Sequence, residues 1–552
     1  MRMSEGGARP DAGWRRALAA LLVVVAAWGT VWALLTPAFR SPDEQTHLNS
    51  VLRLAHGGGW PAPGDAYVAP VIVAAEREAG WPSDLPGRRT PRAGVPQFVD
   101  LVASDRADRT RIDAGNALPA QPPGRDAVVD QMTQHPPAWY ALGAVTLHLT
   151  GLADGRWDHA LLALRLLDVA LLVATVPFAV AAARRLTRSW PAALVAGTFP
   201  LFVPEIGNIL GSANNDALVV LATGVVTWLS VRVVTGDTRW RTAVALGLVL
   251  GVGLLTKVMP AFAIPGVVAA YALAPWGGSG YRRTWWPRLA RLATAGTLTV
   301  AAGGWWWVRN VLTTGAVQPV GRMRDVSGMT EVPADQVLTI AVRRVAQSFW
   351  GHLSWLEVWL PWDFVVAGTL VLVAAAVVAL VLPGARRGAV VLVLLPTALT
   401  AGVIFNAWQF WSATGRLVAL HGRYVYAAIA ALGALVAVAL WQVLGRRESR
   451  TRVALPVVTG LALAAGGAGL WWAFGAFYRG PGESVADAVA RWSAWSPLGP
   501  TALTVVVVTA AVAALAAWVV LTRDALTGAV LTPASLRRRA PRLAAVTRKD
   551  TA

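Results

Sequence analysis

Long apolar runs separated by short polar segments dominate the sequence. Windows of about 20 mainly apolar residues, the length that crosses the hydrocarbon core of a bilayer, recur along the chain. They predict twelve membrane-spanning helices, near residues 17–36, 161–183, 190–207, 215–235, 241–256, 258–275, 289–308, 363–382, 388–405, 424–444, 453–473 and 501–522. A shorter apolar segment, 137–151, is predicted as a juxtamembrane or re-entrant helix, because a thirteenth span there would reverse every later loop. The pattern predicts an all-α polytopic membrane protein.

The composition agrees with this fold class. Of the 552 residues, 55% are hydrophobic and 14% are charged, against about 25% charged in soluble proteins. The 28 tryptophans suit a membrane interface, where this residue is enriched. The absence of cysteine excludes disulfides and thiolate metal sites. The first apolar run follows Arg15 and Arg16 and is long enough to span, so it is predicted to be an uncleaved first helix.

The charged residues orient the predicted helices. With twelve spans, and each charge inside a span assigned to its nearer end, one side holds 27 of the 49 basic residues but only 6 of the 30 acidic ones. Cytoplasmic loops are enriched in Lys and Arg, so this side, with both termini, is predicted to be cytoplasmic. The net charge of +19 is then an orientation signal. Nucleic-acid binding would need basic residues gathered on a soluble face, so no such partner is predicted.

One long loop, 37–136, lies outside the cytoplasm in this topology. It is rich in Pro, Gly, Asp and Arg, and loops longer than about 15 residues are usually functional or disordered. The chain is predicted to divide into a catalytic membrane module over 1–450, C-terminal transmembrane helices over 451–522 and a basic cytoplasmic tail over 523–552. No internal repeat is visible, which weakens an interpretation as a secondary transporter.

Two adjacent acids, Asp43 and Glu44, directly follow the first predicted span. One explanation is local: Ser41 as N-cap, Pro42 at the first helical position and Glu44 closing a capping box would start a helix. The other explanation is functional, because a carboxylate at the edge of the bilayer can act as a general base or bind a metal. The sequence leaves both open.

Further unusual polar residues fall on the same predicted side, namely His135, Asn214, Asn215, Asp216, Lys257, Arg309, Asn310, His352, Glu357, His421 and Arg423. Each has an ordinary explanation, such as snorkelling for Lys257 and Arg309 or a turn at a helix start for Asn215. Within one predicted span, Arg165 and Asp168 are expected to form a structural pair. Together, acids and cations at the depth of a lipid phosphate favour an anionic lipid substrate. Arg423 has more weight than Lys257, because a guanidinium makes paired bonds to phosphate.

Six motifs in order resemble the GT-C superfamily of membrane glycosyltransferases, especially the branch of aminoarabinose transferases and protein O-mannosyltransferases. They lie within residues 17–440 and read "PDEQTH", "HPPAWYAL", "NND", "LLTK", "WWWVRN" and "GRYVYAAIAAL". The resemblance implies a GT-C-like helical bundle in the cell membrane. It also implies transfer of a sugar, with inversion, from a polyprenyl-phosphate donor to a hydroxyl of a glycan, lipid or protein acceptor, at an extracytoplasmic site that serves the cell envelope.

The resemblance assigns roles to the polar residues. Catalytic roles are implied for Asp43, Glu44 and Asp216, and substrate binding is expected for His135, Asn215, Lys257, Arg309, His352, His421 and Arg423. Some relatives bind a divalent metal near the first acid, but the chain has no tight cluster with metal-ligand spacing, so metal dependence stays open. The alternative is a non-catalytic transporter or flippase of a lipid-linked glycan. It would use the same cations but would not need Asp43 as a base.

Overall fold

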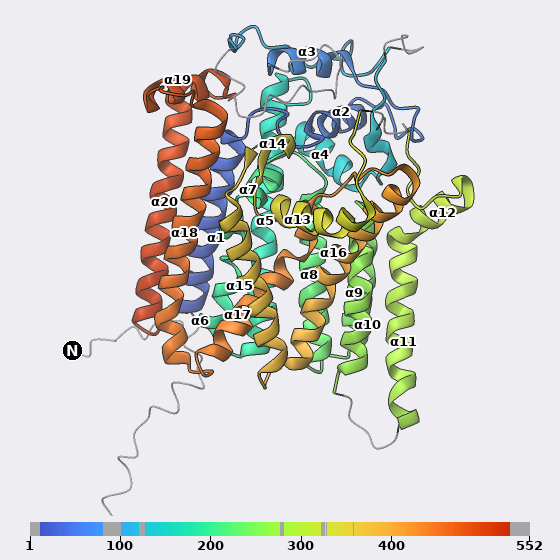
Figure 1. Cartoon of the computed structure of the whole chain (residues 1–552), viewed down its shortest axis with the longest axis vertical. Helices are drawn as coiled ribbons and strands as arrows, with labels where there is room; N and C mark the ends of the chain where they lie inside the picture. Colours follow the sequence, from blue (N-terminus) through green and yellow to red (C-terminus); the bar gives the residue numbers. More distant parts are fainter. Residues whose placement is uncertain are drawn as a thin grey trace, which may run out of the picture.

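The computed structural model describes residues 12–80, 101–120, 127–275, 281–321, 326, 328–356 and 358–529. They form a bundle of helices that carries shorter helices at one end (Figure 1). The all-α fold class is confirmed, since the one strand named among these residues, β1 (Val358–Trp359), has two residues. Glu357 and most of the predicted tail, 530–552, lie outside the described residues.

Eight helical segments are long and apolar enough to cross a membrane, and each coincides with a predicted span. They are α1 (Ala12–Leu35), α5 (Trp157–Thr187), α8 (Asp216–Val234), α15 (Trp362–Val381), α16 (Arg386–Thr414), η6 with α17 (Gly422–Ala428 and Ile429–Val443), α18 (Glu448–Tyr478) and α20 (Pro500–Leu526). The chain is therefore a membrane protein with several transmembrane helices.

The other four predicted spans are shorter or interrupted helices. The windows 241–256 and 258–275 correspond to α9 (Trp240–Leu254) and to η3 with α10 (Met259–Ala263 and Ile264–Leu273). The window 190–207 breaks into α6 (Trp190–Ala196), η2 (Phe199–Phe202) and α7 (Pro204–Leu210). The window 289–308 runs from α11 (Tyr281–Thr299) through η4 (Val300–Gly304) into α12 (Trp305–Thr314). The number of crossings therefore stays a prediction.

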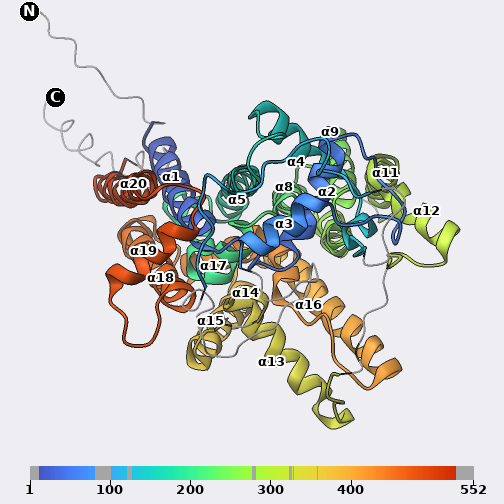
Figure 2. The same cartoon turned by 90° about the horizontal axis from the view of Figure 1, so that it is seen from above.

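The segment after α1 forms a small cap at one end of the bundle. It contains α2 (Glu44–Ala55), α3 (Pro70–Glu78), η1 (Gln131–Gln134) and α4 (Ala138–Leu149), which cover the ends of α5 and α8 when the molecule is seen from above (Figure 2). The segment predicted as a juxtamembrane or re-entrant helix is α4. Its twelve residues span only about 18 Å at 1.5 Å per residue, and it packs on α2 and α5.

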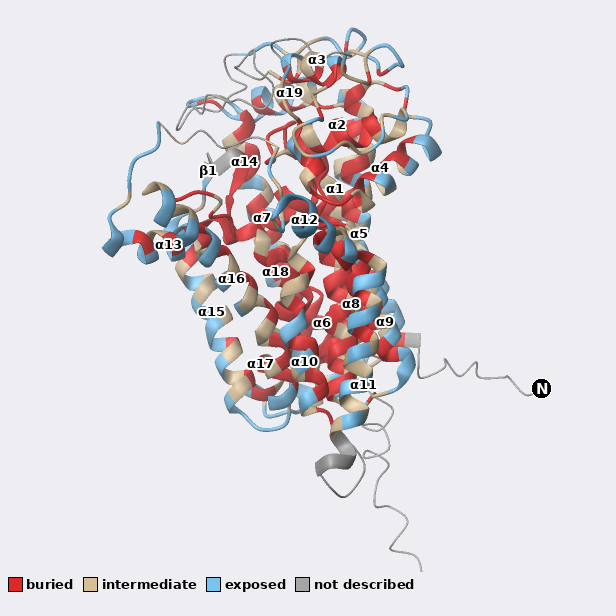
Figure 3. Ribbon diagram, turned by 90° about the vertical axis from the view of Figure 1, so that its right-hand side faces the viewer, coloured by how far each residue is buried: buried red, intermediate tan, exposed pale blue. Residues whose placement is uncertain are grey.

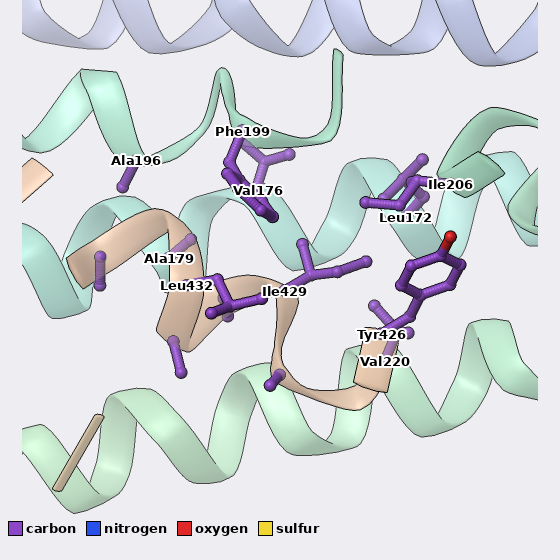
Figure 4. Close-up of a cluster of buried hydrophobic side chains, with 14 of the residues drawn as sticks. Leu172, Val176, Ala179, Ala196, Phe199, Ile206, Val220, Tyr426, Ile429 and Leu432 are labelled. Atoms are coloured by element: carbon purple, nitrogen blue, oxygen red, sulfur yellow. The ribbon is translucent and has the colours of Figure 1, made fainter. Parts of the chain in front are cut away.

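The bundle is organised around α17 and α5. Of an 18-residue apolar stretch in the span that contains α17, 78% is buried inside the protein, against 11% of the corresponding stretch of α20. Val176 of α5 lies beside Phe199, and Leu172 of the same helix lies beside Ile206 of α7 (Figure 4). Buried residues fill the centre, and exposed ones mark the outer helices such as α15 and α11 (Figure 3). The start of α17 is therefore held rigidly in the protein interior.

At the end of the bundle opposite the cap, an ion pair connects the first helix with the last one. Arg16 near the start of α1 and Asp524 near the end of α20 form an ion pair of 3.1 Å. In Figure 1 both helix ends lie away from α2 and α3. The start of α1 and the end of α20 therefore lie at the same end of the bundle, and the membrane topology stays a prediction.

One further short helix at the capped end is α13 (Val337–Trp350), and α14 (Leu353–Leu356) follows it. Near the C-terminus, α19 (Val485–Trp495) connects α18 to α20 at the same end. Side chains at this end connect distant parts of the chain, because Arg109 donates both to Asp158 of α5, at 2.6 Å, and to the Ala494 carbonyl of α19, at 2.9 Å. The cap is thus attached to the bundle at several points.

Candidate active site

Asp43 occupies the junction between α1 and the cap. It is the N-cap of α2 and adopts φ 68° and ψ 5°, in the left-handed region. Aspartate enters this region more readily than most residues, but the conformation costs about 1–3 kcal/mol and is often found at functional sites. Its side chain makes no cap hydrogen bond. The predicted capping box is wrong, because Ser41 is not the N-cap and the Glu44 carboxylate accepts from the Phe39 amide instead, at 2.8 Å.

Glu44 points into the protein interior, where Arg165 holds it. The carboxylate is fully buried and lies 2.7 and 2.8 Å from Arg165 Nη2 and Nε. Its Oε1 also accepts from the backbone amide of Ala213, at 2.9 Å. Arg165 donates in addition to the carbonyls of Ala33, Thr36 and Pro37 at the end of α1. This network ties α1, α5 and the turn before α8 together.

The predicted pairing of Arg165 with Asp168 is therefore wrong, because the described partners of Arg165 do not include Asp168. Asp168 accepts instead from the indole of Trp139, at 2.7 Å, and from the backbone amide of Asn214, at 2.8 Å. The physical reason is that the end of α1 and the residues after it offer Arg165 three carbonyls, and the start of α2 offers it the buried carboxylate of Glu44. Glu44 and Asp168 thus hold consecutive residues of the 213–214 turn, which presents Asp216 at the start of α8.

Asp43 and Arg423 form the first ion pair of the site. Arg423, in η6 at the start of α17, places Nη2 2.6 Å from Asp43 Oδ2 and Nη1 3.3 Å from the Pro42 carbonyl. The Asp43 side chain remains 33% exposed, so part of it is accessible. Burial by itself raises the pKa of Asp43, but the charge and hydrogen bond of Arg423 outweigh it and hold that pKa below its usual range.

Asp216 and Lys257 form the second ion pair. Lys257, between α9 and η3, places Nζ 2.6 Å from Asp216 Oδ1, and both side chains are buried. The two cations of the site face the same aromatic ring, since Lys257 Nζ and Arg423 Cζ lie 5.3 and 5.5 Å from the ring centroid of Tyr424. Lys257 is thus a paired interior residue, and the snorkelling explanation does not describe it.

His47 is a site residue that the sequence analysis missed. Its Nδ1 lies 3.0 Å from the hydroxyl of Tyr140, which accepts a hydrogen bond from Asn215 Nδ2 at 3.3 Å. Burial lowers the pKa of His47 to about 3, although the charge of Asp43 opposes this shift. The ring is therefore neutral. The available signal was its spacing, because residues four apart on a helix share one face and His47 follows Asp43 by four.

Two predicted histidines also lie close to the charged residues. Burial lowers the pKa of His135 well below its usual value, and the charges of Lys257 and Asp216 act on it as well. His421 Nδ1 accepts from the Arg423 backbone amide, at 3.2 Å, and burial lowers its pKa in the same way. The structure thus gathers His135 and His421 with Asn215 around the two ion pairs.

The remaining predicted residues lie at the margin or elsewhere. His352 is next to this group: its backbone amide donates to Glu205, at 3.0 Å, and its ring packs 3.7 Å from that of Trp359. Arg309 is exposed on α12, with its guanidinium 5.6 Å from the ring centroid of Trp306. Within the described part of the chain Arg309 contacts neither ion pair, and α12 projects from the side of the bundle (Figure 1).

The arrangement does not fit a divalent metal among the described residues. No group of three or more His, Asp or Glu side chains there could hold an ion. Asp43 and Asp216, the acids nearest to such a role, are each bound by a cationic side chain at 2.6 Å. A metal would have to displace these partners.

An apolar cavity of about 530 Å³ lies beside the site. It is lined by α13, α15, α16 and α17, and Phe349 and Val425 are among its residues. Both belong to the segments that position Arg423, since Gly422 N donates to Ser348 Oγ at 2.7 Å and Tyr426 donates to the Phe349 carbonyl at 2.7 Å. The cavity therefore opens beside η6, the element that carries Arg423.

Comparisons with known proteins give a family and several structural neighbours, among them the following two. The model of a family described as predicted membrane protein (DUF2142) matches residues 27–432. A search of curated proteins found no match. The chain is similar to ArnT from Cupriavidus metallidurans bound to undecaprenyl phosphate, with 15% identity, a TM-score of 0.45, and coverage of 94% of this chain and 78% of that one.

The second neighbour is the archaeal oligosaccharyltransferase AglB from Archaeoglobus fulgidus in complex with an inhibitory peptide and a dolichol-phosphate. It has 14% identity and a TM-score of 0.41, and the match covers 86% of this chain and 57% of that one. These neighbours have the GT-C fold, which is the fold that the sequence motifs resemble.

Proposed function

The chain belongs to the DUF2142 family of predicted membrane proteins, and we propose that it is a membrane glycosyltransferase. It moves a sugar from a polyprenyl-phosphate donor to an acceptor hydroxyl on the extracytoplasmic face of the cell membrane, with inversion. The observation that carries the proposal is the pair of ion pairs, Asp43 with Arg423 and Asp216 with Lys257, around one aromatic ring and beside an apolar cavity. The order of the sequence motifs supports it.

The two cations suit a lipid phosphate. Without substrate, Arg423 and Lys257 are each offset by one carboxylate, so the site holds no uncompensated charge from these four groups. A phosphate group brings negative charge and oxygen acceptors that can share both cations, and a guanidinium can bind it through two parallel hydrogen bonds. The leaving group after transfer is a phosphate with more negative charge, so the cations also stabilise its departure.

The apolar cavity suits the hydrocarbon chain of such a donor. Its lining comes from α15, α16 and α17 of the membrane bundle and from α13 at the capped end, and it consists of apolar side chains with Thr369, Thr397 and Thr400. A polyprenyl chain placed there brings its phosphate to the end of the bundle where η6 lies. Burial of apolar surface gives the non-directional part of donor binding, and the cations give the position.

Asp43 is the base in this proposal. The acceptor hydroxyl gives its proton to the Asp43 carboxylate, the acceptor oxygen forms a bond to the anomeric carbon, and the bond from that carbon to the phosphate oxygen breaks with its electron pair on the phosphate. Arg423 keeps the pKa of Asp43 low while the two are paired. A donor phosphate that engages Arg423 weakens this pairing, so donor binding increases the basicity of Asp43.

The other two acids, Glu44 and Asp216, hold neighbouring parts of the site in position. Glu44 is fully buried and saturated by Arg165 and backbone amides, so we assign it to holding the 213–214 turn. Asp216 positions Lys257 at the distance of a direct ion pair. Both roles differ from the direct chemistry expected from the motif resemblance.

Turnover of a defined donor tests the proposal. Purified protein incubated with an undecaprenyl-phosphoryl sugar and candidate hydroxyl acceptors should release undecaprenyl phosphate, and the Asp43→Asn variant should not. Movement of the intact donor across vesicle membranes without cleavage, unaffected by Asp43→Asn, would instead identify a transporter or flippase.

A further inference from the structure

Uncharged hydrogen-bonding groups surround the two ion pairs, and several of them lack partners. Among the described residues, Asn215 Oδ1, His135 Nδ1 and His421 Nε2 are buried atoms without a hydrogen bond. Buried polar atoms are almost always paired, because leaving them unpaired after desolvation is unfavourable. These three atoms belong to side chains that are at least nine-tenths buried, close to Asp43 and Asp216. They can be satisfied by a ligand.

His47 and His421 are neutral, and each is expected to donate a hydrogen bond from Nε2. Asn215 Nδ2 can only donate to the Tyr140 hydroxyl, so among the described contacts His47 Nδ1 is the one acceptor available for the hydroxyl proton, and we assign that proton to it. His421 Nδ1 likewise accepts from the Arg423 amide. A neutral imidazole whose Nδ1 accepts a hydrogen bond carries its proton on Nε2. Both rings therefore offer an Nε2–H donor, and neither Nε2 makes a hydrogen bond within the described part of the chain.

The mixture of donors and acceptors identifies the ligand chemistry. A phosphate oxygen only accepts, and the cations Lys257 and Arg423 already suit it. Asn215 Oδ1, by contrast, can only accept, so it needs a donor on the ligand. A sugar hydroxyl both donates and accepts, and it matches a set that contains Asn215 Oδ1 together with two Nε2–H groups.

We propose that Asn215, Tyr140, His47 and His421 form the sugar-recognition part of the site, with Tyr140 acting as a positioning residue that fixes the tautomer of His47. This inference rests on the proposed function and adds which residues recognise the transferred group. It divides the site into charged residues that bind the lipid phosphate and uncharged residues that bind the hydroxyls of the sugar.

Binding of two lipids with and without a sugar tests this division. Undecaprenyl phosphate and undecaprenyl-phosphoryl mannose, and the arabinose analogue in parallel, are titrated into purified full-length protein in detergent. At least one sugar should strengthen binding by the parent over undecaprenyl phosphate alone. Asn215→Ala and Tyr140→Phe should each weaken binding of that sugar-bearing lipid by about 5-fold to 12-fold, the upper part of the range for one neutral hydrogen bond, and should change binding of undecaprenyl phosphate by less than about 2-fold.

Two control variants separate this role from a structural one. Lys257→Ala should weaken both lipids, because it removes a phosphate ligand. Tyr478→Phe should weaken neither, since its buried hydroxyl donates to the Leu35 carbonyl, at 3.1 Å, away from the ion pairs. If Asn215→Ala does not fold, Tyr140→Phe decides alone, because it keeps the ring and its packing. His421→Gln, which retains an N–H donor near the Nε2 position, should bind the sugar-bearing lipid better than His421→Phe.

Two results would overturn the inference. Equal loss of both lipids in Tyr140→Phe would place these residues in phosphate binding or in the fold. The second result is a parent protein that binds undecaprenyl phosphate but binds neither sugar-bearing lipid more tightly. It would contradict sugar recognition by these residues and leave the proposed lipid-phosphate site intact. A parent that binds neither lipid would overturn the proposed function itself.

Discussion

Arg423 Nη2 lies 2.6 Å from Asp43 Oδ2, although 380 positions separate the two residues in the sequence. The contact joins the start of α17, in the most buried part of the bundle, to the first residues after α1. An arginine on a rigid element thus holds an aspartate whose backbone is in the left-handed region. A residue stays in such a strained backbone conformation only where the contacts around it hold it there.

Asp43→Asn should abolish most sugar transfer while the protein still folds. Asparagine tolerates the left-handed region about as well as aspartate and can still accept from Arg423, but it cannot take a proton. Loss of general-base help predicts a decrease of about 100-fold to 10,000-fold in the transfer rate. The rate is measured at saturating donor, with donor binding within a few fold of the parent as the control. Near-parental transfer would return Asp43 to a structural role.

Arg423→Gln should move the acid limb of the pH–rate profile to higher pH. In the parent, Arg423 holds the pKa of Asp43 below its usual range, so the carboxylate stays ionised to low pH. Without the guanidinium, burial raises that pKa, and protonation removes the base at a higher pH. The profile of residual transfer is recorded at limiting donor, because the pH dependence of kcat/KM reports the free enzyme. An unchanged acid limb would mean that another group is the base.

The Asp43–Arg423 pair also makes the free energy of unfolding depend on pH, and the direction of that dependence can be predicted. The folded pKa of Asp43 is lowered, so its contribution to the free energy of unfolding is present above the unfolded value of about 3.9 and is lost as pH falls through the folded value. Arg423→Gln should therefore reduce the pH dependence of thermal unfolding on the acid side, which serves as an activity-independent control for the shift.

Glu44→Gln should destabilise the protein rather than slow the reaction selectively. The variant leaves the Arg165 guanidinium buried without its carboxylate, and breaking a buried pair in this way costs about 3–5 kcal/mol. Glu331→Gln is a matched control, because its pair with Arg416, at 3.5 Å, has a carboxylate that is 74% exposed and is worth about 0–1 kcal/mol. Thermal unfolding of both variants in one detergent checks the contrast. A parental unfolding temperature with a large loss of turnover would make Glu44 a reacting group.

Ala376→Trp should weaken binding of long-chain lipid phosphate. Ala376 of α15 lines the 530 Å³ cavity, and an indole there occupies the space that the proposal assigns to the polyprenyl chain. Val371→Trp, on the same helix but exposed, is the matched control and should bind like the parent. Titration with undecaprenyl phosphate and with a short-chain isoprenyl phosphate distinguishes the mechanisms. Equal weakening of both lipids would mean that the substitution disturbs the phosphate site and not the chain.

Single cysteines should establish which side of the membrane carries the cap. The chain has no cysteine, so Ala120→Cys, at an exposed position of the cap, and Ala545→Cys, near the C-terminus, each introduce one thiol. An impermeant reagent should label the first in intact cells and the second only after permeabilisation, because the positive-inside rule places the termini in the cytoplasm. Labelling of Ala545→Cys in intact cells would invert the topology and place the site in the cytoplasm.

The sequence by itself determined where the helices form. Length and hydrophobicity of a window decide whether a helix can cross a bilayer, and both are local properties, so every predicted span corresponds to helical structure. Breaks inside two of the predicted spans were less predictable. Pro200 and Pro204 interrupt the window 190–207, where each proline removes a backbone donor, and yet Pro177 lies within the continuous helix α5.

Only the tertiary structure decided which polar residues act together. The sequence named Asp43, Asp216, Lys257 and Arg423, but it did not predict that they form two separate ion pairs across 380 and 41 positions. Local spacing suggested that Arg165 pairs with Asp168 and that Glu44 caps a helix, and both predictions were wrong. In the interior a charged group takes the partners that satisfy it most completely, because an unpaired buried charge is far costlier than a lost local contact. Those partners come from distant segments, and no local pattern records them.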